Sequence, residues 1–354
     1  MKNQTEAEVP ATEHVLAVRD LRTHFLTRDG AVRAVDGVSF DVKRGETLCI
    51  VGESGCGKSV SALSIMRLLP DDGSCSMTGS VRFDGAELTS LFEHEMRAIR
   101  GNRISMIFQE PMTSLNPVLT VGEQIAESVR IHQRLGQRAA WDRAVEMLSL
   151  VRIADPLRRA SEYPHQLSGG MRQRVMIAMA LACNPKVLIA DEPTTALDVT
   201  IQAQILKLMM ELNGRVGAAI MLITHDLGVI AGIADRVMVM YGGQVVEHAP
   251  VDQIFHSPQH PYTRALLRTI PTITGKREAR LSVIEGQPPI MAQAPKACPF
   301  GARCAHHFAR CDAENPQRRP LDSLPLGQGH DVQEGQKAIV LRDFVARNFA
   351  GNDA

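Results

Sequence analysis

The stretch GESGCGKS, at residues 52–59, decides the fold class of this 354-residue chain. It matches the pattern G-x-x-x-x-G-K-[ST], follows the apolar segment TLCIV, and precedes the helix-forming segment KSVSALSIMRLLP. A strand that turns through glycines into a helix presents backbone N–H groups, which bind phosphate oxygens. We therefore expect a phosphate-binding loop, in which Lys58 reaches the β- and γ-phosphates of a nucleotide and Ser59 holds Mg²⁺.

Most residues of this loop, and Val60 just after it, are expected to contact the nucleotide. The predicted set is Gly52, Ser54, Gly55, Cys56, Gly57, Lys58, Ser59 and Val60. Cys56 is interpreted as a small filler rather than a nucleophile, because nothing nearby in the sequence marks a base. A chance glycine-rich turn is the competing interpretation, and the strand before the loop and the helix after it argue against that.

Composition excludes several other classes of protein. A hydrophobic share of 44% is enough to fill a core, so wholesale disorder is excluded. Lys and Arg number 39, as do Asp and Glu, which leaves no basic surplus for general nucleic-acid binding. No apolar run approaches the roughly 18–20 residues that cross a bilayer, and the N-terminus lacks the apolar core of a signal peptide. We expect a cytosolic chain whose membrane role comes through partners.

Strand and helix signals alternate along the chain, which predicts an α/β fold with a mixed sheet covered by helices on both faces. The expected strands are 15–26, 31–42, 47–52, 80–88, 104–109, 186–191, 218–226, 236–241 and 243–248, and the expected helices are 58–70, 121–132, 139–151 and 199–213, with a short helix after 226.

Four regions follow from this pattern. Residues 1–14 are polar and expected to be frayed, and residues 15–270 are expected to form one domain. A helical subdomain is inserted in that domain at about 112–182. From 271 the composition becomes rich in Pro and Arg, which predicts a C-terminal extension over 271–354.

Two acids end the apolar strand VLIADE at 187–192. Buried charges at a strand end are costly unless they serve a ligand. Asp191 therefore suits the Mg²⁺ site, and Glu192 suits polarisation of the attacking water. An ordinary solvated strand end is the alternative, which the upstream phosphate loop disfavours.

Between these motifs lies LSGGMRQR, at 167–174, and with it the sequence resembles the ATP-binding subunits of ABC transporters over about 15–270. Ser168, Gly169 and Gly170 begin a helix, so their hydroxyl and N–H groups make a second anion site. In the family this site closes on the γ-phosphate held by a partner subunit. Taken alone, Ser-Gly-Gly would be only a helix cap.

The resemblance assigns further roles. Gln109 matches the glutamine that senses Mg²⁺, Asp198 belongs to the loop that crosses the dimer interface, and His225 matches the switch histidine at the γ-phosphate. Phe25 is our choice for the aromatic that stacks on adenine, with a core phenylalanine as the alternative.

Two segments resemble the branch of the family that imports oligopeptides and dipeptides, which also includes nickel-type importers. They are EPMTSLNPVLTVGEQI at 110–125 and SPQHPYTRALL at 257–267. The resemblance implies ATP hydrolysis with Mg²⁺ at the cytoplasmic face of the inner membrane, peripheral to two permease subunits and served indirectly by a solute-binding protein. It also implies a second ATPase subunit, for which we favour a heterodimer over a homodimer. A soluble ABC ATPase acting on nucleic acid or ribosomes is the alternative function, and a weakly active regulatory half of an asymmetric pair is a third.

Three cysteines gather at Cys298, Cys304 and Cys311. In the importer branch this segment supplies ligands to a four-iron, four-sulfur cluster. The family's fourth cysteine follows a Gly-His pair, but after His330 this chain has none. The alternatives are a non-Cys ligand (His306, His330 or Glu334), a weakly held cluster, or a cysteine segment without metal. The transported solute is equally open at this stage.

Overall fold

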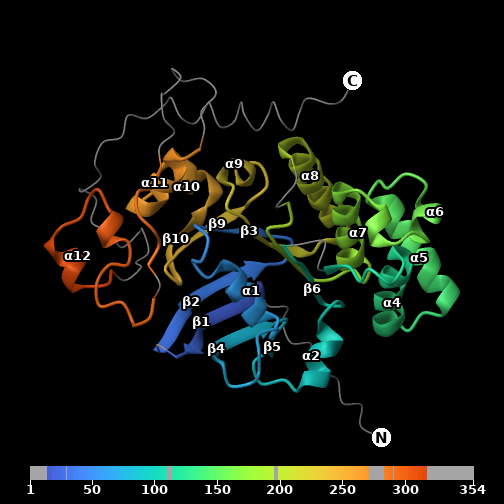
Figure 1. Cartoon of the computed structure of the whole chain (residues 1–354), viewed down its shortest axis with the longest axis horizontal. Helices are drawn as coiled ribbons and strands as arrows, with labels where there is room; N and C mark the ends of the chain where they lie inside the picture. The colour runs from blue at the N-terminus through green and yellow to red at the C-terminus, as the bar shows by residue number, and fades with distance from the viewer. Residues whose placement is uncertain are drawn as a thin grey trace, which may run out of the picture.

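Two β-sheets form the centre of the protein (Figure 1). The computed structural model describes residues 14–28, 30–109, 114–194, 198–270, 283–289 and 291–316. The larger sheet has six strands in the order β10-β9-β3-β8-β7-β6, all parallel except β10. Its strands are β3 (Thr47–Val51), β6 (Ile104–Ile107), β7 (Val187–Asp191), β8 (Ala219–Ile223), β9 (Arg236–Tyr241) and β10 (Gln244–Pro250).

The smaller sheet is antiparallel, with four strands in the order β2-β1-β4-β5. They are β1 (His14–Thr27), β2 (Gly30–Lys43), β4 (Cys75–Phe83) and β5 (Ala86–Glu87). The expected strands 15–26, 31–42 and 80–88 fall on β1, β2 and the β4–β5 hairpin. That they form a second sheet is new, because alternation along a strand does not say which neighbour the strand pairs with.

Helices cover both faces of the larger sheet, as predicted, although one face shares this cover with the smaller sheet. The helices are α1 (Lys58–Ile65), α2 (Glu93–Ile99), α4 (Val121–Gln133), α5 (Gln137–Leu150), α6 (Pro156–Ala160), α7 (Gly169–Leu181), α8 (Val199–Val216), α9 (Leu227–Ile230), α10 (Val251–His256), α11 (Pro261–Arg268) and α12 (Ala309–Ala313), with 3₁₀ turns η1 (Pro164–Gln166) and η2 (Gly301–Arg303).

The prediction that the helix after the phosphate loop runs to Pro70 is wrong at its end. The helix stops at Ile65, and Arg67 takes a left-handed φ of +50°. The Leu68 N–H then donates to the Leu63 carbonyl at 2.9 Å, which closes the last turn. A non-glycine residue ends this helix, so the sequence carries no glycine signal there.

Alternate residues of each central strand face two separate cores. On β3, Leu48 and Ile50 face the side of α1 and the smaller sheet, whereas Cys49 and Val51 face the side of α7 and α8. The strand is buried on both sides, which explains its unbroken apolar run. The chain between two such cores has little freedom to move, so residues at the strand ends are held in fixed positions.

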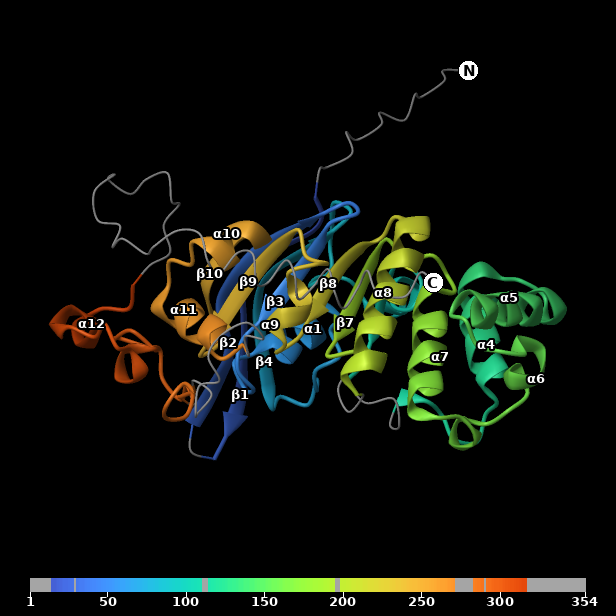
Figure 2. The ribbon, with the colours of Figure 1, turned by 90° about the horizontal axis from the view of Figure 1, so that it is seen from above.

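The remaining helices extend the molecule in two opposite directions. Helices α4, α5 and α6 lie at one end of the molecule and α12 at the other, in both views (Figures 1 and 2). Helices α4 to α7 lie within the range of about 112–182 expected for the helical subdomain. Within the described ranges, no helix is long and apolar enough to cross a membrane.

Candidate functional site

The residues predicted to handle a nucleotide follow four neighbouring parallel strands. The phosphate loop joins β3 to α1, and β3 pairs with β8 in parallel. Gln109 follows β6, Asp191 ends β7, and His225 follows β8. Because parallel strands end at the same edge of a sheet, all four features meet at the carboxyl edge, which is where ligands bind in open α/β sheets.

The loop itself is a tight turn with a buried base and an exposed tip. Ser54 and Gly55 are exposed, whereas Cys56 is buried. Burial raises the pKa of the Cys56 thiol, which agrees with its interpretation as a filler. Gly57 precedes α1 with φ of +99°, and no side chain caps the start of that helix. The first N–H groups of α1 are thus left for a ligand such as phosphate.

The Lys58 ammonium lies inside the loop. It donates to the carbonyl oxygens of Gly52 at 2.7 Å and Glu53 at 2.9 Å, and the residue is 5% exposed. It also lies 3.7 Å from the Cys56 sulfur, and none of these three contacts is with a carboxylate that would neutralise the buried charge. Its positive charge therefore favours an anionic ligand in the loop.

Ser59 and Asp191 form the next contact outward from Lys58. Ser59 Oγ donates to Asp191 Oδ1 at 2.9 Å. Burial raises the pKa of the Asp191 carboxyl, and the neighbouring Glu192 charge adds to that rise, while the Ser59 hydroxyl and the Lys58 ammonium oppose it. A hydroxyl and a buried carboxylate side by side are oxygen donors of the kind that Mg²⁺ accepts beside phosphate oxygens.

Glu192 contacts two other residues of the predicted site. Gln109 Nε2 donates to Glu192 Oε2 at 3.2 Å, and His225 Nδ1 lies 3.3 Å from the same oxygen. The Glu192 side chain is 15% exposed and that of His225 is 64% exposed, so the histidine stands at the open side. Glu192 also has φ of +44°, a conformation that costs a non-glycine residue about 1–2 kcal/mol. Backbone strain of this kind gathers at functional sites.

The signature segment begins α7, apart from these contacts. Ser168 caps the helix, its hydroxyl accepting from the Met171 N–H at 3.4 Å, and both Ser168 and Gly169 are exposed. A Cβ atom on Gly170 would lie 3.4 Å from Ile201 of α8, which places the segment beside that helix. Asp198 caps α8 and is exposed as well. Both predicted partner-facing segments are thus helix starts open to an incoming surface.

Phe25 lies near the end of β1, opposite Val32 and Cys75, and is partly exposed. Neither of these strand partners belongs to the phosphate loop, so its role at adenine stays a prediction. Val60 lies in the first turn of α1. The residues 110–113 and 195–197 lie outside the described ranges.

The residues that bind Glu53 of the phosphate loop were not identified from the sequence. Glu53 donates its N–H to the Tyr262 hydroxyl at 2.9 Å, and its carboxylate receives two hydrogen bonds from Arg303, at 2.7 and 2.9 Å. Tyr262 belongs to the SPQHPYTRALL segment and Arg303 to the cysteine segment, so both lay in quoted motifs. No spacing rule, however, connects residues 250 positions apart.

The three clustered cysteines surround one turn. The Cys298 N–H donates to the Cys311 carbonyl at 2.8 Å, and the Cys304 N–H donates to Gly301 at 3.1 Å. Burial raises the pKa of the Cys298 thiol, which opposes the thiolate that a metal needs. Over the described residues, no three His, Cys, Asp or Glu side chains are arranged to hold a metal ion. Among the described residues, these cysteines therefore form no metal site, and all seven cysteines are free.

Of the three other candidate fourth ligands, only His306 lies among the described residues. His306 is exposed, and its N–H donates to the Cys304 sulfur at 3.4 Å. His330 and Glu334 lie outside the described residues.

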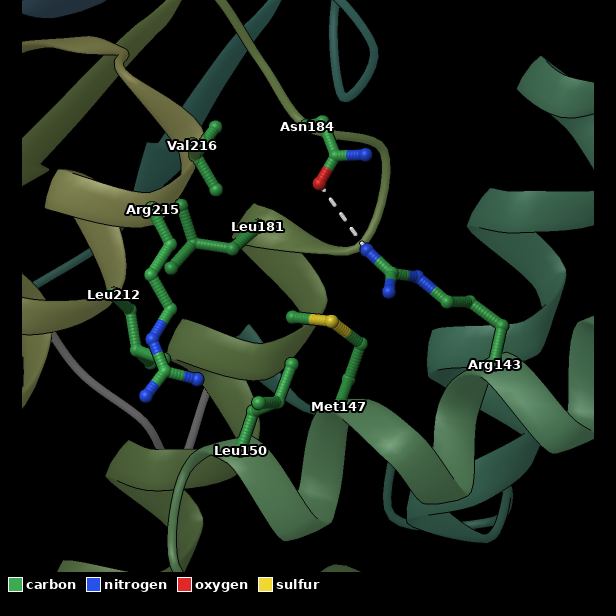
Figure 3. Close-up of a pocket in the computed structure, with 8 residues that line it drawn as sticks. All are labelled: Arg143, Met147, Leu150, Leu181, Asn184, Leu212, Arg215 and Val216. Carbon is green, nitrogen blue, oxygen red and sulfur yellow. Dashed lines mark hydrogen bonds between the residues drawn. The ribbon is translucent and has the colours of Figure 1, made fainter.

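A surface pocket of about 330 Å³ lies away from the nucleotide motifs (Figure 3). It is lined by Arg143, Met147, Leu150, Leu181, Asn184, Leu212, Arg215 and Val216. Arg143 donates to the Asn184 side chain at 3.1 Å across one side of it. The lining has no carboxylate, histidine or thiol, so it offers no acid or base for hydrolysis.

Comparison with known proteins places two family matches on the chain. Residues 35–195 match the ABC transporter family, and residues 246–311 match the C-terminal region of oligopeptide/dipeptide transporters. The first range contains the phosphate loop, Glu192 and the signature segment. The second contains Tyr262, Arg303 and the three clustered cysteines, and it begins before the composition change at 271.

Relatives and solved structures agree with these matches. A probable peptide ABC transporter ATP-binding protein of Sinorhizobium fredii, y4tR, is 56% identical and covers 87% of this chain and 92% of its own. The dipeptide transport ATP-binding protein DppD of Bacillus subtilis is 53% identical over 94% and 99% of the two chains. The dimeric structure of MJ0796, a bacterial ABC transporter cassette, superposes with a TM-score of 0.60 at 30% identity, covering 67% of this chain and 98% of that one.

Proposed function

The chain belongs to the family of ABC transporter ATP-binding proteins, and from this premise we propose that it hydrolyses ATP to energise peptide import through a membrane permease. One observation carries the hydrolytic part of the proposal. Lys58, the Ser59–Asp191 pair and the Glu192 contacts converge at the carboxyl edge of the parallel strands of the larger sheet. The peptide part is supported by the names of the relatives and by the C-terminal match over 246–311.

Each residue has a stated task in the hydrolysis. The loop N–H groups and Lys58 bind the phosphates and stabilise the charge that spreads over the transferred group. Glu192 accepts a hydrogen bond from the attacking water and aligns it with the γ-phosphorus, while Gln109 fixes the carboxylate that does so. His225, on the exposed side of Glu192, contacts the γ-phosphate. Mg²⁺, when bound by Ser59 and Asp191 with Gln109 nearby, neutralises phosphate charge.

Two helix starts favour a second ATPase subunit as partner. Ser168 and Gly169 at the start of α7 and Asp198 at the start of α8 are exposed. Exposed helix N-termini attract anions such as phosphate. We propose that the α7 start closes on a nucleotide held by the loop of the second subunit, so that two ATP molecules join the dimer. A different ATPase chain is the favoured second subunit, and a second copy of this chain is the other outcome.

Purification from membranes tests the transport proposal. We expect the full-length chain, extracted in mild detergent, to carry two permease subunits and a second ATPase, all peripheral to or within the cytoplasmic membrane. Peptide uptake should stop in the Lys58→Ala variant, which keeps its permease but binds ATP poorly. Co-purification with ribosomes or DNA instead would contradict the transport proposal. Uptake of nickel without uptake of peptides would contradict the proposed cargo.

Iron content tests the cysteine prediction separately. An iron–sulfur cluster at Cys298, Cys304 and Cys311 predicts stoichiometric iron and its absorption bands in protein purified without oxygen. A chain that hydrolyses ATP fully without iron would show that the cluster is no part of the activity.

A further inference from the structure

The segment that carries the three clustered cysteines also contains an arginine, Arg303, whose side chain donates hydrogen bonds from all three of its nitrogen atoms. Arg303 ends the η2 turn, and its side chain is 6% exposed. Nη1 and Nη2 donate to the two carboxylate oxygens of Glu53 at 2.7 and 2.9 Å. The other bonds go to the Tyr241 hydroxyl at 3.2 Å and to the carbonyls of Ile284 at 3.1 Å and Glu285 at 2.8 Å. All five guanidinium N–H groups therefore have acceptors.

This contact reaches the phosphate loop through a single residue. Glu53 is the second residue of the loop, and its backbone is fixed at both ends of the residue. Its N–H donates to the Tyr262 hydroxyl at 2.9 Å, and its carbonyl accepts from the Lys58 ammonium at 2.9 Å. The carboxylate, carbonyl and N–H of Glu53 thus all make hydrogen bonds. Glu53 is the single residue that contacts both Arg303 and Lys58 in this chain of bonds.

The segment that carries Arg303 is packed firmly against the ATPase domain. Phe300 is 3% exposed, and its ring lies 5.3 Å from the rings of both Tyr241 and Tyr262, centre to centre. The Arg33 N–H on β2 also donates to the Met291 carbonyl at 2.8 Å. The guanidinium is therefore anchored by an aromatic cluster and not by its own ion pair alone.

Charge gives this arrangement a consequence for ATP. Glu53 places a carboxylate in a loop that has to accept a polyanion. Left unpaired, that carboxylate would repel the phosphates in a partly buried site where charges interact strongly. The bidentate guanidinium cancels the charge and fixes the loop backbone before ATP arrives, which lowers the entropy cost of binding.

We propose that Arg303 is a positioning residue for ATP, which neutralises Glu53 and holds the phosphate loop in its binding conformation. The C-terminal segment thereby sets the ATP affinity of the nucleotide site. This role rests on the proposed ATP hydrolysis at the loop. A purely structural ion pair would fasten the segment without changing how the site treats ATP.

Steady-state ATP hydrolysis and ATP titration of the full-length chain test the role. We expect Arg303→Ala to raise KM and Kd for ATP about tenfold, with kcat changed less than about twofold. Adding Glu53→Gln to Arg303→Ala should return most of the lost affinity, because it removes the unpaired carboxylate. Arg303→Lys keeps the charge but not the two-pronged geometry, so its KM should fall between those of the wild type and Arg303→Ala.

Arg310→Ala is the matched control, because Arg310 lies in the same segment on α12, is exposed, and its guanidinium pairs with Glu314 at 2.9 Å, away from the phosphate loop. It should behave like the wild type. The inference is overturned if Arg303→Ala matches Arg310→Ala, or if its losses appear in kcat and thermal stability and Glu53→Gln does not restore KM. Lys58→Ala separates the two levels: if it loses ATP binding while Arg303→Ala does not, only the inference fails, and a wild type that does not bind ATP overturns both.

Discussion

The glycines of the phosphate loop differ in what surrounds them. A Cβ atom on Gly57 would lie 2.2 Å from the Ala34 carbonyl oxygen of β2, and its φ is +99°. A Cβ atom on Gly55 would meet nothing within 4 Å, although its φ is also positive, at +79°. The two positions therefore separate the cost of backbone conformation from the cost of a collision with a neighbouring strand.

Gly57→Ala should cost far more than Gly55→Ala. At Gly55 the added methyl group incurs only the left-handed penalty of about 1–2 kcal/mol. At Gly57 the loop must also move away from β2, which moves Lys58 and the start of α1. We expect Gly57→Ala to abolish measurable ATP binding in a titration and Gly55→Ala to weaken it by about tenfold. Equal affinities in the two variants would contradict this account of the loop.

At the scale of elements, α11 shows how the C-terminal part meets the ATPase domain. His260 caps α11, its Nδ1 accepting from the Tyr262 N–H at 3.1 Å. Its own N–H donates to the Glu247 carboxylate of β10 at 2.9 Å, and its ring lies 6.1 Å from that of Phe300. Burial lowers the pKa of His260 from 6.5 to about 4. The cap is thus held as neutral imidazole, whose Nδ1 lone pair it needs.

This shift makes stability depend on pH in one direction. Between pH 6.5 and about 4 the unfolded chain binds a proton at His260 that the folded chain does not, so stability falls as the pH falls through that window. The contribution is at most about 3 kcal/mol. His260→Asn keeps a short capping acceptor and does not titrate. Urea unfolding from pH 7 to pH 4 should show a shallower loss in the variant, and equal slopes would refute the assignment.

Many of the helices and strands could be predicted from the sequence, and those that could not were missed for physical reasons. The strands and the helices α4, α5 and α8 carry clear periodicity over long segments, so they could be predicted. The helices α10 and α11 are too short to show a clear period, so they were not predicted. The pairing of β1, β2 and β4 into their own sheet was not predicted either, because it depends on which strands become neighbours in space. The site motifs were local in sequence and therefore recognisable. The Arg303–Glu53 contact depends on how two distant segments pack.

At the scale of the whole molecule, the nucleotide loop lies between two outlying parts. Helices α4, α5 and α6 are at one end and α12 at the other (Figure 2). The exposed start of α7 lies on the helical side, and the loop is braced from the C-terminal side by Arg303. On this account, ATP joins the chain to a second subunit, and hydrolysis releases that connection.

Glu192→Gln tests this account most directly, through the nucleotide that the purified complex keeps after gel filtration. Gln cannot act as the base, yet it leaves the phosphate loop and the Ser59–Asp191 pair unchanged. Turnover should fall by at least about 100-fold with ATP affinity retained, so the variant should elute as a dimer of ATPase subunits holding intact ATP. Lys58→Ala, as control, should hold none. Recovery of ADP formed at the wild-type rate would contradict the role of Glu192 and the hydrolytic mechanism built on it.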